Sequence, residues 1–402
     1  MTTATIDAVS AKNTALLEGP GKASAPESSE IVKVAREYGV SPLKQLREMI
    51  ALNLSPARLE FPEYFSNRLF DPDMTMAQKR EYVGKASNWR LNQTLSPHGL
   101  VRSNRVVKNK LLYSSLLNSL GLRSTRTQAL VANFPRGGAI PTFSNAADLK
   151  AFLLNDARYP LFGKPNGGSL SAGSACIVGV DGVAGTAKLA DGRQVSLDAL
   201  CTEMAGDHRG GFLLQDALVQ HPDMAAIIGK AIGSLRIVTV TEGDIAYPLY
   251  SVWKIPSPTA MSDNFWQDGS MIGAIDLETG KVTRARTGSG LKGRDIETHP
   301  VSGKHLLGFQ IPHFREALAL ACRAHDVFPE FGVLGFDMAI TADGPAVVEC
   351  NDNPFHMLYQ IANQRGVRNA DFNPVFARVA ARAKWEFTEY RKSVKRRYKT
   401  IF

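Results

Sequence analysis

The sequence predicts an α+β protein, in which a helical N-terminal region is followed by two units that mix helices with antiparallel strands. Apolar residues between Ile31 and Leu95 recur at steps of three and four, which is the spacing of a helix face. Beyond them, short apolar runs are joined by turns rich in glycine, aspartate and asparagine, which favours antiparallel sheets over a parallel array. A chain of 402 residues is long enough for two or three cores.

Composition excludes several classes of protein. Hydrophobic residues make up 44% and charged residues 21%, an ordinary globular balance. No apolar run reaches the roughly 18 residues that a membrane-spanning helix needs. The N-terminal residues lack a secretory pattern, and the four cysteines form no CxxC pair, so we expect reduced thiols and a cytoplasmic protein.

The net charge of +9 is concentrated near the C-terminal end. Between Arg378 and Phe402, nine basic residues stand against two acidic ones, so the rest of the chain is nearly neutral and is not expected to bind nucleic acid. Residues 376–402 are predicted to form a basic helix. The alternatives for this helix are that it is simply solvated, or that it makes weak contact with an anionic membrane surface or a nucleic acid.

The elements are predicted in order along the chain. Residues 1–29 are rich in alanine, serine and threonine, and we expect a disordered leader. Residues 30–98 form the helical region, in which Ser41 caps a helix that starts at Pro42. Four aromatic residues are expected to pack this region onto the body: Phe61, Tyr64, Phe65 and Phe70.

The two mixed units are expected at 99–218 and 219–375. The first has a predicted helix at 108–120, a strand at 128–133, a helix at 145–154 capped by Ser144, and a β-rich segment at 159–218. The second has predicted strands at 235–241, 333–340 and 346–350, a helix at 308–327, and a last helix from about residue 373.

The first segment with chemical content surrounds Lys164. This lysine leaves an apolar strand just before a loop that contains Gly167, Gly168 and Ser169. Glycines let a backbone approach phosphate oxygens closely, and the lysine adds a positive charge. An ordinary glycine-containing hairpin explains the segment equally well, and no P-loop sequence is present.

Two further strands carry polar residues among apolar ones. Gln215, Asp216 and Leu218 end an apolar strand that could present backbone groups to an adenine, although a plain buried strand explains this segment better by itself. Arg236 lies inside another apolar strand, and a buried arginine requires an anionic partner. A phosphate and a structural carboxylate are equally good candidates for that partner.

The strongest pattern is formed by three polar residues on the last two strands. Glu349 and Asn351 share a face because they are two residues apart. If the hairpin is centred on Asp343, then Asp337 lies opposite Glu349, and two opposed carboxylates destabilise a hairpin unless a cation lies between them. Three oxygen ligands suit Mg²⁺ or Mn²⁺ rather than zinc. The alternative is one exposed carboxylate and one that pairs with an arginine.

The order of these motifs, over residues 100–375, resembles that of ATP-grasp enzymes. The chain is most similar to the sugar-transfer-associated ATP-grasp subgroup, which is related to α-L-glutamate ligases. The residues that carry this closer resemblance are Asn264-Phe265 with Gly269, 275–280, His299-Pro300 with Gly303, Ile311-Pro312 and 349–354. The glycine-rich loop departs from the family pattern at Leu170 and Ala172.

The resemblance implies two α+β lobes that clasp ATP, and it implies roles for individual residues. Lys110 (with Lys108 as its neighbour) and Lys164 match the phosphate lysines, and Gly167, Gly168 and Ser169 match the phosphate loop. Gln215, Asp216 and Leu218 match the adenine and ribose contacts. Asp337, Glu349 and Asn351 match the metal ligands, and Arg236 matches a catalytic arginine that, with Lys164, steadies the transferred phosphoryl group.

The implied activity is that of an ATP- and Mg²⁺-dependent carboxylate–amine ligase that forms ADP. Cations neutralise the repulsion between a carboxylate and the γ-phosphate, an acyl phosphate forms, and an amine or similar nucleophile attacks it. Expected substrates are small-molecule or glycan-linked carboxylates and amines, in cell-surface polysaccharide or peptide-conjugate synthesis. The alternatives are a nucleotide-binding regulatory module without turnover and a small-molecule kinase on the same fold.

Overall fold

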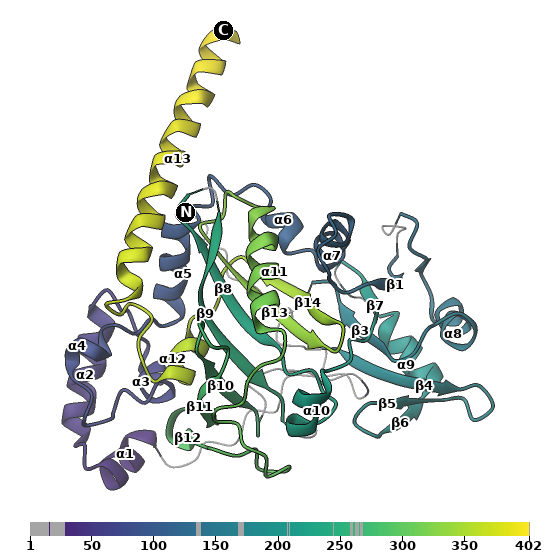
Figure 1. Ribbon diagram of the computed structural model, residues 1–402, viewed down its shortest axis with the longest axis horizontal. Coiled ribbons are helices and arrows are strands. Elements are labelled where there is room, and N and C mark those ends of the chain that lie inside the picture. Colours follow the sequence, from purple (N-terminus) through teal and green to yellow (C-terminus); the bar gives the residue numbers. More distant parts are fainter. Residues whose placement is uncertain are drawn as a thin grey trace.

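Two seven-stranded sheets form the body of the protein, with helices packed against them (Figure 1). The structure is a computed structural model. It describes residues 16, 29–133, 138–167, 173–206, 208, 210–243, 245–257, 260, 261, 265 and 268–401, with the backbone alone at 395 and 397–401. The predicted α+β class is confirmed. Of the leader expected at 1–29, only Leu16 and Ser29 lie within the described residues.

Five helices form the described part of the helical N-terminal region, as the periodicity predicts. They are α1 (Glu30–Tyr38), α2 (Pro42–Leu54), α3 (Phe61–Ser66), α4 (Met76–Lys79) and α5 (Lys85–Leu95). Ser41 caps α2 by accepting a hydrogen bond from the Lys44 N–H at 3.3 Å. The expected packing of the aromatic residues needs correction. Tyr64, Phe65 and Phe70 fill a small core of this region's own, because α1–α3 close around them, while Phe61 is exposed.

The first sheet has the strand order β2-β1-β7-β3-β4-β5-β6 and is antiparallel except for the β1–β2 pair. Its strands are β1 (Thr127–Val131), β2 (Thr142–Phe143), β3 (Leu161–Pro165), β4 (Ala175–Asp181), β5 (Thr186–Leu189), β6 (Gln194–Ser196) and β7 (Phe212–Asp216). Helices α8 (Ala146–Asn155) and α9 (Leu197–Met204) pack against it, whereas α6 (Asn104–Val107) and α7 (Lys110–Ser119) contribute mainly to the core of the second sheet.

Two expectations for this unit are corrected. The cap of α8 is Asn145 rather than Ser144, because the Asn145 Oδ1 accepts from the Asp148 N–H at 2.9 Å. The segment predicted as β-rich also contains α9, whose buried apolar residues pack into the same core as the sheet.

The second sheet is antiparallel throughout, in the order β12-β11-β10-β9-β8-β13-β14. Its strands are β8 (Leu235–Thr241), β9 (Ala246–Ile255), β10 (Met271–Ile275), β11 (Val282–Thr287), β12 (Arg294–Asp295), β13 (Val333–Thr341) and β14 (Gly344–Asn351). Its helices are α10 (Pro222–Ile228), the 3₁₀ turn η1 (Gly290–Lys292), α11 (Phe314–Asp326), α12 (Met357–Asn363) and α13 (Phe372–Ile401). The helix predicted at 308–327 starts only at Phe314, because Pro312 disfavours helix in the residue before it.

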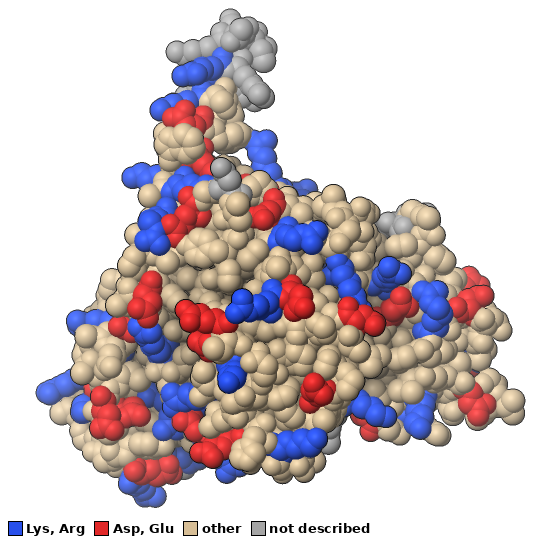
Figure 2. Space-filling model, viewed as in Figure 1, with Lys and Arg blue, Asp and Glu red and all other residues tan. Residues whose placement is uncertain are grey.

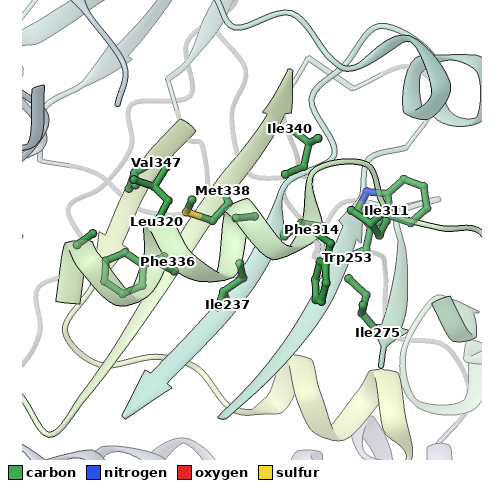
Figure 3. Packing of buried hydrophobic residues seen from close by; sticks show 14 of the residues in the cluster. Ile237, Trp253, Ile275, Ile311, Phe314, Leu320, Phe336, Met338, Ile340 and Val347 are labelled. Atoms are coloured by element: carbon green, nitrogen blue, oxygen red, sulfur yellow. The ribbon is translucent and has the colours of Figure 1, made fainter. Parts of the chain in front are cut away.

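Strand alternation divides the second sheet into an apolar face and a polar one. Ile237, Trp253 and Phe336 pack under α11, where they meet Phe314 and Leu320 (Figure 3). Successive side chains on a strand point to opposite faces, so Arg236, Lys254 and Asp337 lie on the other face. That face is covered by α12 and by the start of α13. The predicted functional residues of this sheet therefore share one face.

The last helix leaves the body of the protein. Figure 1 shows α13 extending well beyond the other helices, and Figure 2 shows Lys and Arg side chains along it, with some acidic ones among them. Its 30 residues correspond to about 45 Å of helix. Among the described residues, no helix has both the length and the apolar character needed to cross a membrane.

Candidate active site

The hairpin of β13 and β14 has the register that the sequence predicts, but a β-bulge is needed to produce it. The strands join through a tight turn that by itself would place Asp337 opposite Val348. A bulge next to Asp337 shifts the pairing by one residue, so that Asp337 lies opposite Glu349. Asn351 lies two residues further along and shares a face with Glu349. The three predicted metal ligands are thus neighbours on one hairpin.

Asp337 binds two buried cationic side chains. Arg236 on β8 donates from Nε to Oδ1 at 2.6 Å and from Nη2 to Oδ2 at 3.1 Å, and the Lys254 Nζ on β9 donates to Oδ2 at 3.0 Å. Burial opposes the negative charge, but Arg236 and Lys254 outweigh it and hold the pKa of the Asp337 carboxyl well below its usual range. Of the two partners considered for Arg236, the structure shows a carboxylate.

Lys254 was missed by the sequence analysis, although a signal was present. It is a single charged residue near the end of the apolar strand β9, just as Arg236 is near the start of β8. Only 9% of its side chain is exposed. Because a buried ammonium group requires an anionic partner, such a lysine could have been treated in the same way as Arg236.

The start of α7 connects the hairpin to the first sheet. The Lys110 Nζ lies 3.6 Å from the Glu349 Oε1, and the neighbouring Lys108 Nζ lies 3.0 Å from the Asp352 Oδ2. On the other side, the Leu111 N–H donates to the Asn166 Oδ1 at 3.2 Å. The predicted phosphate lysine Lys110 therefore lies between the two sheets.

Lys164 lies on β3, one of the central strands of the first sheet. Only 8% of the residue is exposed, and its Nζ is 6.0 Å from the centre of the Phe162 ring. Gly167, which is exposed, follows two residues after the strand. Gly168 and Ser169 of the predicted phosphate loop lie outside the described residues.

Gln215 and Asp216 point to opposite faces of β7, because they are consecutive residues of a strand. The Gln215 amide nitrogen donates to the hydroxyls of Thr125 and Thr127 at 3.1 and 3.2 Å. Its carbonyl oxygen is buried and has no hydrogen-bond partner within the part of the chain that the structure describes. An unpaired buried acceptor of this kind fits a ligand that offers an N–H group, such as the amino group of an adenine.

Asp216 and Leu218 line a cavity of about 490 Å³, together with residues from the segment between α7 and β1. The Asp216 Oδ1 accepts hydrogen bonds from Gln128 at 2.7 Å and from Arg158 at 3.2 Å. Asp216 and Leu218 therefore share one cavity, whereas the structure does not bring Gln215 into it.

The helical region holds the loop that follows the predicted metal ligands. The Asn92 Nδ2 on α5 donates to the Asn353 Oδ1 at 2.7 Å and to the Pro354 carbonyl at 2.9 Å. Its Oδ1 lies 3.0 Å from the His356 Nε2, and the Asn88 Oδ1 accepts from the His356 N–H at 2.9 Å. These asparagines position the loop, and helical periodicity contains no signal that could have found them.

Residues 94–373 match the family model described as sugar-transfer-associated ATP-grasp, which is well over half of the chain. The chain belongs to the sugar-transfer-associated ATP-grasp family. Its two sheets with their helices are the two α+β lobes of the ATP-grasp fold, and they are called the N-terminal and C-terminal lobes below. The resemblance stated from the motif order is confirmed.

Solved structures match at low identity and with low TM-scores. N5-carboxyaminoimidazole synthase from Aspergillus clavatus, in complex with ADP and a ribonucleotide, is 15% identical, with 62% of this chain and 45% of that chain covered and a TM-score of 0.33. An L-amino acid ligase from Bacillus licheniformis is 13% identical, with 62% and 41% covered and a TM-score of 0.32. The ATP-grasp ligase PsnB with a minimal precursor is 12% identical, with 72% and 62% covered and a TM-score of 0.35.

The matched part spans less than half of the length of the first two of these proteins. No curated protein sequence matches the chain.

Proposed function

We propose that this chain is an ATP- and Mg²⁺-dependent ligase that activates a carboxylate as an acyl phosphate for attack by an amine or a similar nucleophile, with release of ADP. The observation that carries the proposal is the array of cations around Asp337 and Glu349. Arg236 and Lys254 come from the C-terminal lobe, and Lys110 reaches Glu349 from the start of α7. Such an array suits the charge that builds up when a phosphoryl group is transferred to a carboxylate.

The residues present fit Mg²⁺ and a nucleotide. Asp337 is ionised, Glu349 is partly exposed, and Asn351 adds an amide oxygen, so three hard oxygen atoms suited to Mg²⁺ lie on one hairpin. In this structure both Asp337 oxygens accept hydrogen bonds from Arg236 and Lys254. When bound, Mg²⁺ supplies positive charge against the phosphate oxygens. Lys110 and Lys164 would hold phosphates together with the backbone of Gly167, Gly168 and Ser169. Gln215, Asp216 and Leu218 would hold the nucleoside.

The proposed reaction requires no covalent catalysis by a side chain. A substrate carboxylate oxygen bonds to the γ-phosphorus, the bond to the β-phosphate oxygen breaks, and ADP leaves. An amine nitrogen then attacks the acyl carbon, loses a proton, and displaces inorganic phosphate. In the first step Arg236 would be drawn from Asp337 toward the transferred phosphoryl group, which resembles a carboxylate in its ability to accept two parallel N–H bonds.

We propose small-molecule or glycan-linked carboxylates and amines as substrates, in cell-surface polysaccharide or peptide-conjugate synthesis, because the family is associated with sugar transfer. A cytoplasmic location belongs to the same proposal. All four cysteines are free thiols, which supports a reducing compartment.

The test is an assay of ADP release with a panel of carboxylates and amines, on the wild type, Lys164→Met and the matched control Lys188→Met. Lys188 is an exposed lysine on β5 of the same lobe. We expect ADP release only when a carboxylate and an amine are both present, and a loss of about 100-fold or more for Lys164→Met alone. ADP release with a single alcohol would instead support the kinase, and ATP binding without turnover across the panel would support the regulatory module.

A further inference from the structure

A cavity of about 750 Å³ lies between the helical region and the edge of the C-terminal lobe. Its walls come from segments near α1, α3 and α4 on one side and from β11, η1 and β12 on the other. Five basic and three acidic residues line it, so the cavity carries an excess of positive charge. The basic residues are Arg68, Arg284, Arg286, Lys292 and Arg294.

Arg286 is the most buried of these residues and is incompletely paired. Only 4% of its side chain is exposed. Its Nη1 pairs with Asp295, but its Nε is buried without a hydrogen-bond partner among the described residues. A buried N–H group without an acceptor is unfavourable, so an acceptor supplied by a ligand would stabilise the protein here.

The available carboxylate does not neutralise the arginines around it. Asp295 is shared between Arg284, at 2.7 Å, and Arg286, and 53% of its side chain is exposed. Burial lowers the pKa of Arg286 to about 10, because it disfavours the charged form. The charge of Asp295 opposes this shift, and the charges of Arg284 and Arg68 add to it. The guanidinium group of Arg286 therefore lies in a poorly hydrated place with an excess of positive charge.

Arg68 is held on the opposite wall by contacts distant in sequence. It donates a hydrogen bond to the Gly293 carbonyl at 2.7 Å, and its guanidinium carbon lies 5.6 Å from the ring centres of both Tyr38 and Phe70. Its backbone has a φ of 57°, in the left-handed region that residues other than glycine rarely adopt. Strained residues of this kind are concentrated at ligand sites.

The strand register shows that this cavity is separate from the proposed active site. Ile272 on β10 pairs with Lys254 on one side and with Arg286 on the other. Ile272 is fully buried and packs with residues of α12 on that sheet face. Asp337 lies on β13, two strands beyond Lys254. Packed side chains therefore separate the cavity from the Asp337 cluster.

We propose that this cavity is a second ligand site, which binds the anionic group, a carboxylate or a phosphate, of a small molecule. The proposal goes beyond the proposed ligase function and does not depend on it. Arg286 would donate from Nε, while Arg68, Lys292 and Arg294 would supply the surrounding charge.

The test is calorimetric titration of the full chain with inorganic phosphate and with succinate, at low ionic strength. Four variants are compared with the wild type: Arg286→Gln, the double variant Lys292→Gln/Arg294→Gln, Lys164→Met and Lys188→Met. We expect binding to the wild type and at least a tenfold loss in affinity for the two cavity variants. Lys188→Met is expected to bind both probes as the wild type does, and Lys164→Met reports any binding of the probes at the nucleotide site. If Arg286→Gln fails to fold, the double variant at the cavity rim still decides the question.

Two results would overturn the anion site. The first is that the folded wild type binds neither probe. The second is that Lys164→Met weakens the binding and the cavity variants do not, because the probe then occupies the nucleotide site. ATP binding is measured in parallel. Probe binding without ATP binding would support the anion site and reject the ligase function, whereas ATP binding without probe binding would reject the anion site and leave the ligase function standing.

Discussion

At the scale of single residues, Arg236 and Asp337 show how opposite charges are paired in the interior of this protein. The carboxylate of Asp337 accepts three hydrogen bonds from two cations, and these bonds compensate for its removal from water. Two of the three come from one guanidinium group in a fork that a lysine cannot reproduce. The pair therefore depends on arginine in particular, and charge alone at position 236 is not sufficient.

Replacement of Arg236 by lysine tests this dependence. We expect Arg236→Lys to lower the free energy of unfolding by about 1–3 kcal/mol, because one charge-assisted hydrogen bond is lost. Arg236→Ala is expected to cost more, about 3–5 kcal/mol, because it leaves a buried charge poorly paired. Urea denaturation of the two variants gives both values, and equal stability of all three proteins would contradict the pairing.

Two buried histidines make stability depend on pH. Burial lowers the pKa of His325 to about 4 and that of His356 to about 3. In the unfolded chain both titrate near about pH 6.5, so below that pH the unfolded state binds more protons than the folded one. The contribution of the two neutral histidines to stability is therefore fully present above about pH 6.5. Below that pH the free energy of unfolding falls by about 2.7 kcal/mol per pH unit, between about pH 6 and 4.

Urea denaturation between about pH 7 and 4.5 measures this slope. His356→Gln removes one of the two titrating groups, so we expect its slope to be about half that of the wild type. His305 is exposed, and His305→Gln serves as the control that keeps the full slope. A stability that is independent of pH in this range would show that the two histidines are not held neutral by burial.

At the scale of the elements, α5 of the helical region holds the loop that follows β14. The hairpin of β13 and β14 carries the proposed metal ligands, but the direction of the chain after Asn351 is held by α5 of the helical region. The helical region is therefore part of the support of the site. The family model, which begins at residue 94, contains almost none of that region.

Asn92→Leu tests this support. The substitution removes the hydrogen bonds of Asn92 to the Asn353 side chain, the Pro354 carbonyl and the His356 Nε2, so we expect a loss of about 2–3 kcal/mol in the free energy of unfolding. We also expect slower ADP release, although Asn92 is not among the residues proposed to touch the nucleotide. Thr94→Ala, at an exposed position on the same helix, is the matched control. Unchanged ADP release in a folded Asn92→Leu protein would show that α5 does not position the loop.

Prediction of the elements succeeded where local patterns determine them. The strand β8 and the Ser41 cap lie where the sequence places them, because alternation and capping depend on neighbouring residues. Prediction failed for the start of α11 and for α9. The division of the chain at residues 98, 218 and 375 stays a prediction, as do the individual roles of the site residues.

At the scale of the whole molecule, α13 divides into a packed part and a projecting part. Phe376, Val379 and Ala383 are buried against the C-terminal lobe, and Arg102 stacks on Tyr390 at 4.6 Å. The C-terminal part of the helix projects from the body (Figure 1). The alternatives for this basic end, a solvated helix and one that contacts an anionic membrane surface, stay predictions.

A truncation after Tyr390 distinguishes them. If the projecting part contacts anionic lipids, the full chain is expected to sediment with phosphatidylserine-containing vesicles at low salt, and the truncated chain is not. We expect the truncated chain to keep its thermal stability and its ADP release, because the removed residues lie outside the core. Neutral phosphatidylcholine vesicles are the control, and an absence of sedimentation with either vesicle would support the solvated helix.

The sequence by itself determined the α+β class, the order of most elements, and the group of polar residues on the last hairpin, because each depends on patterns within a few residues of one another. Only the tertiary structure decided which cations meet those residues. Arg236 and Asp337 are 101 residues apart, and Arg68 and Gly293 are 225 apart. Such pairs leave no local pattern, because burial and charge bring them together only when the sheet and the helical region pack. The cation cluster and the positively charged cavity are therefore properties of the fold.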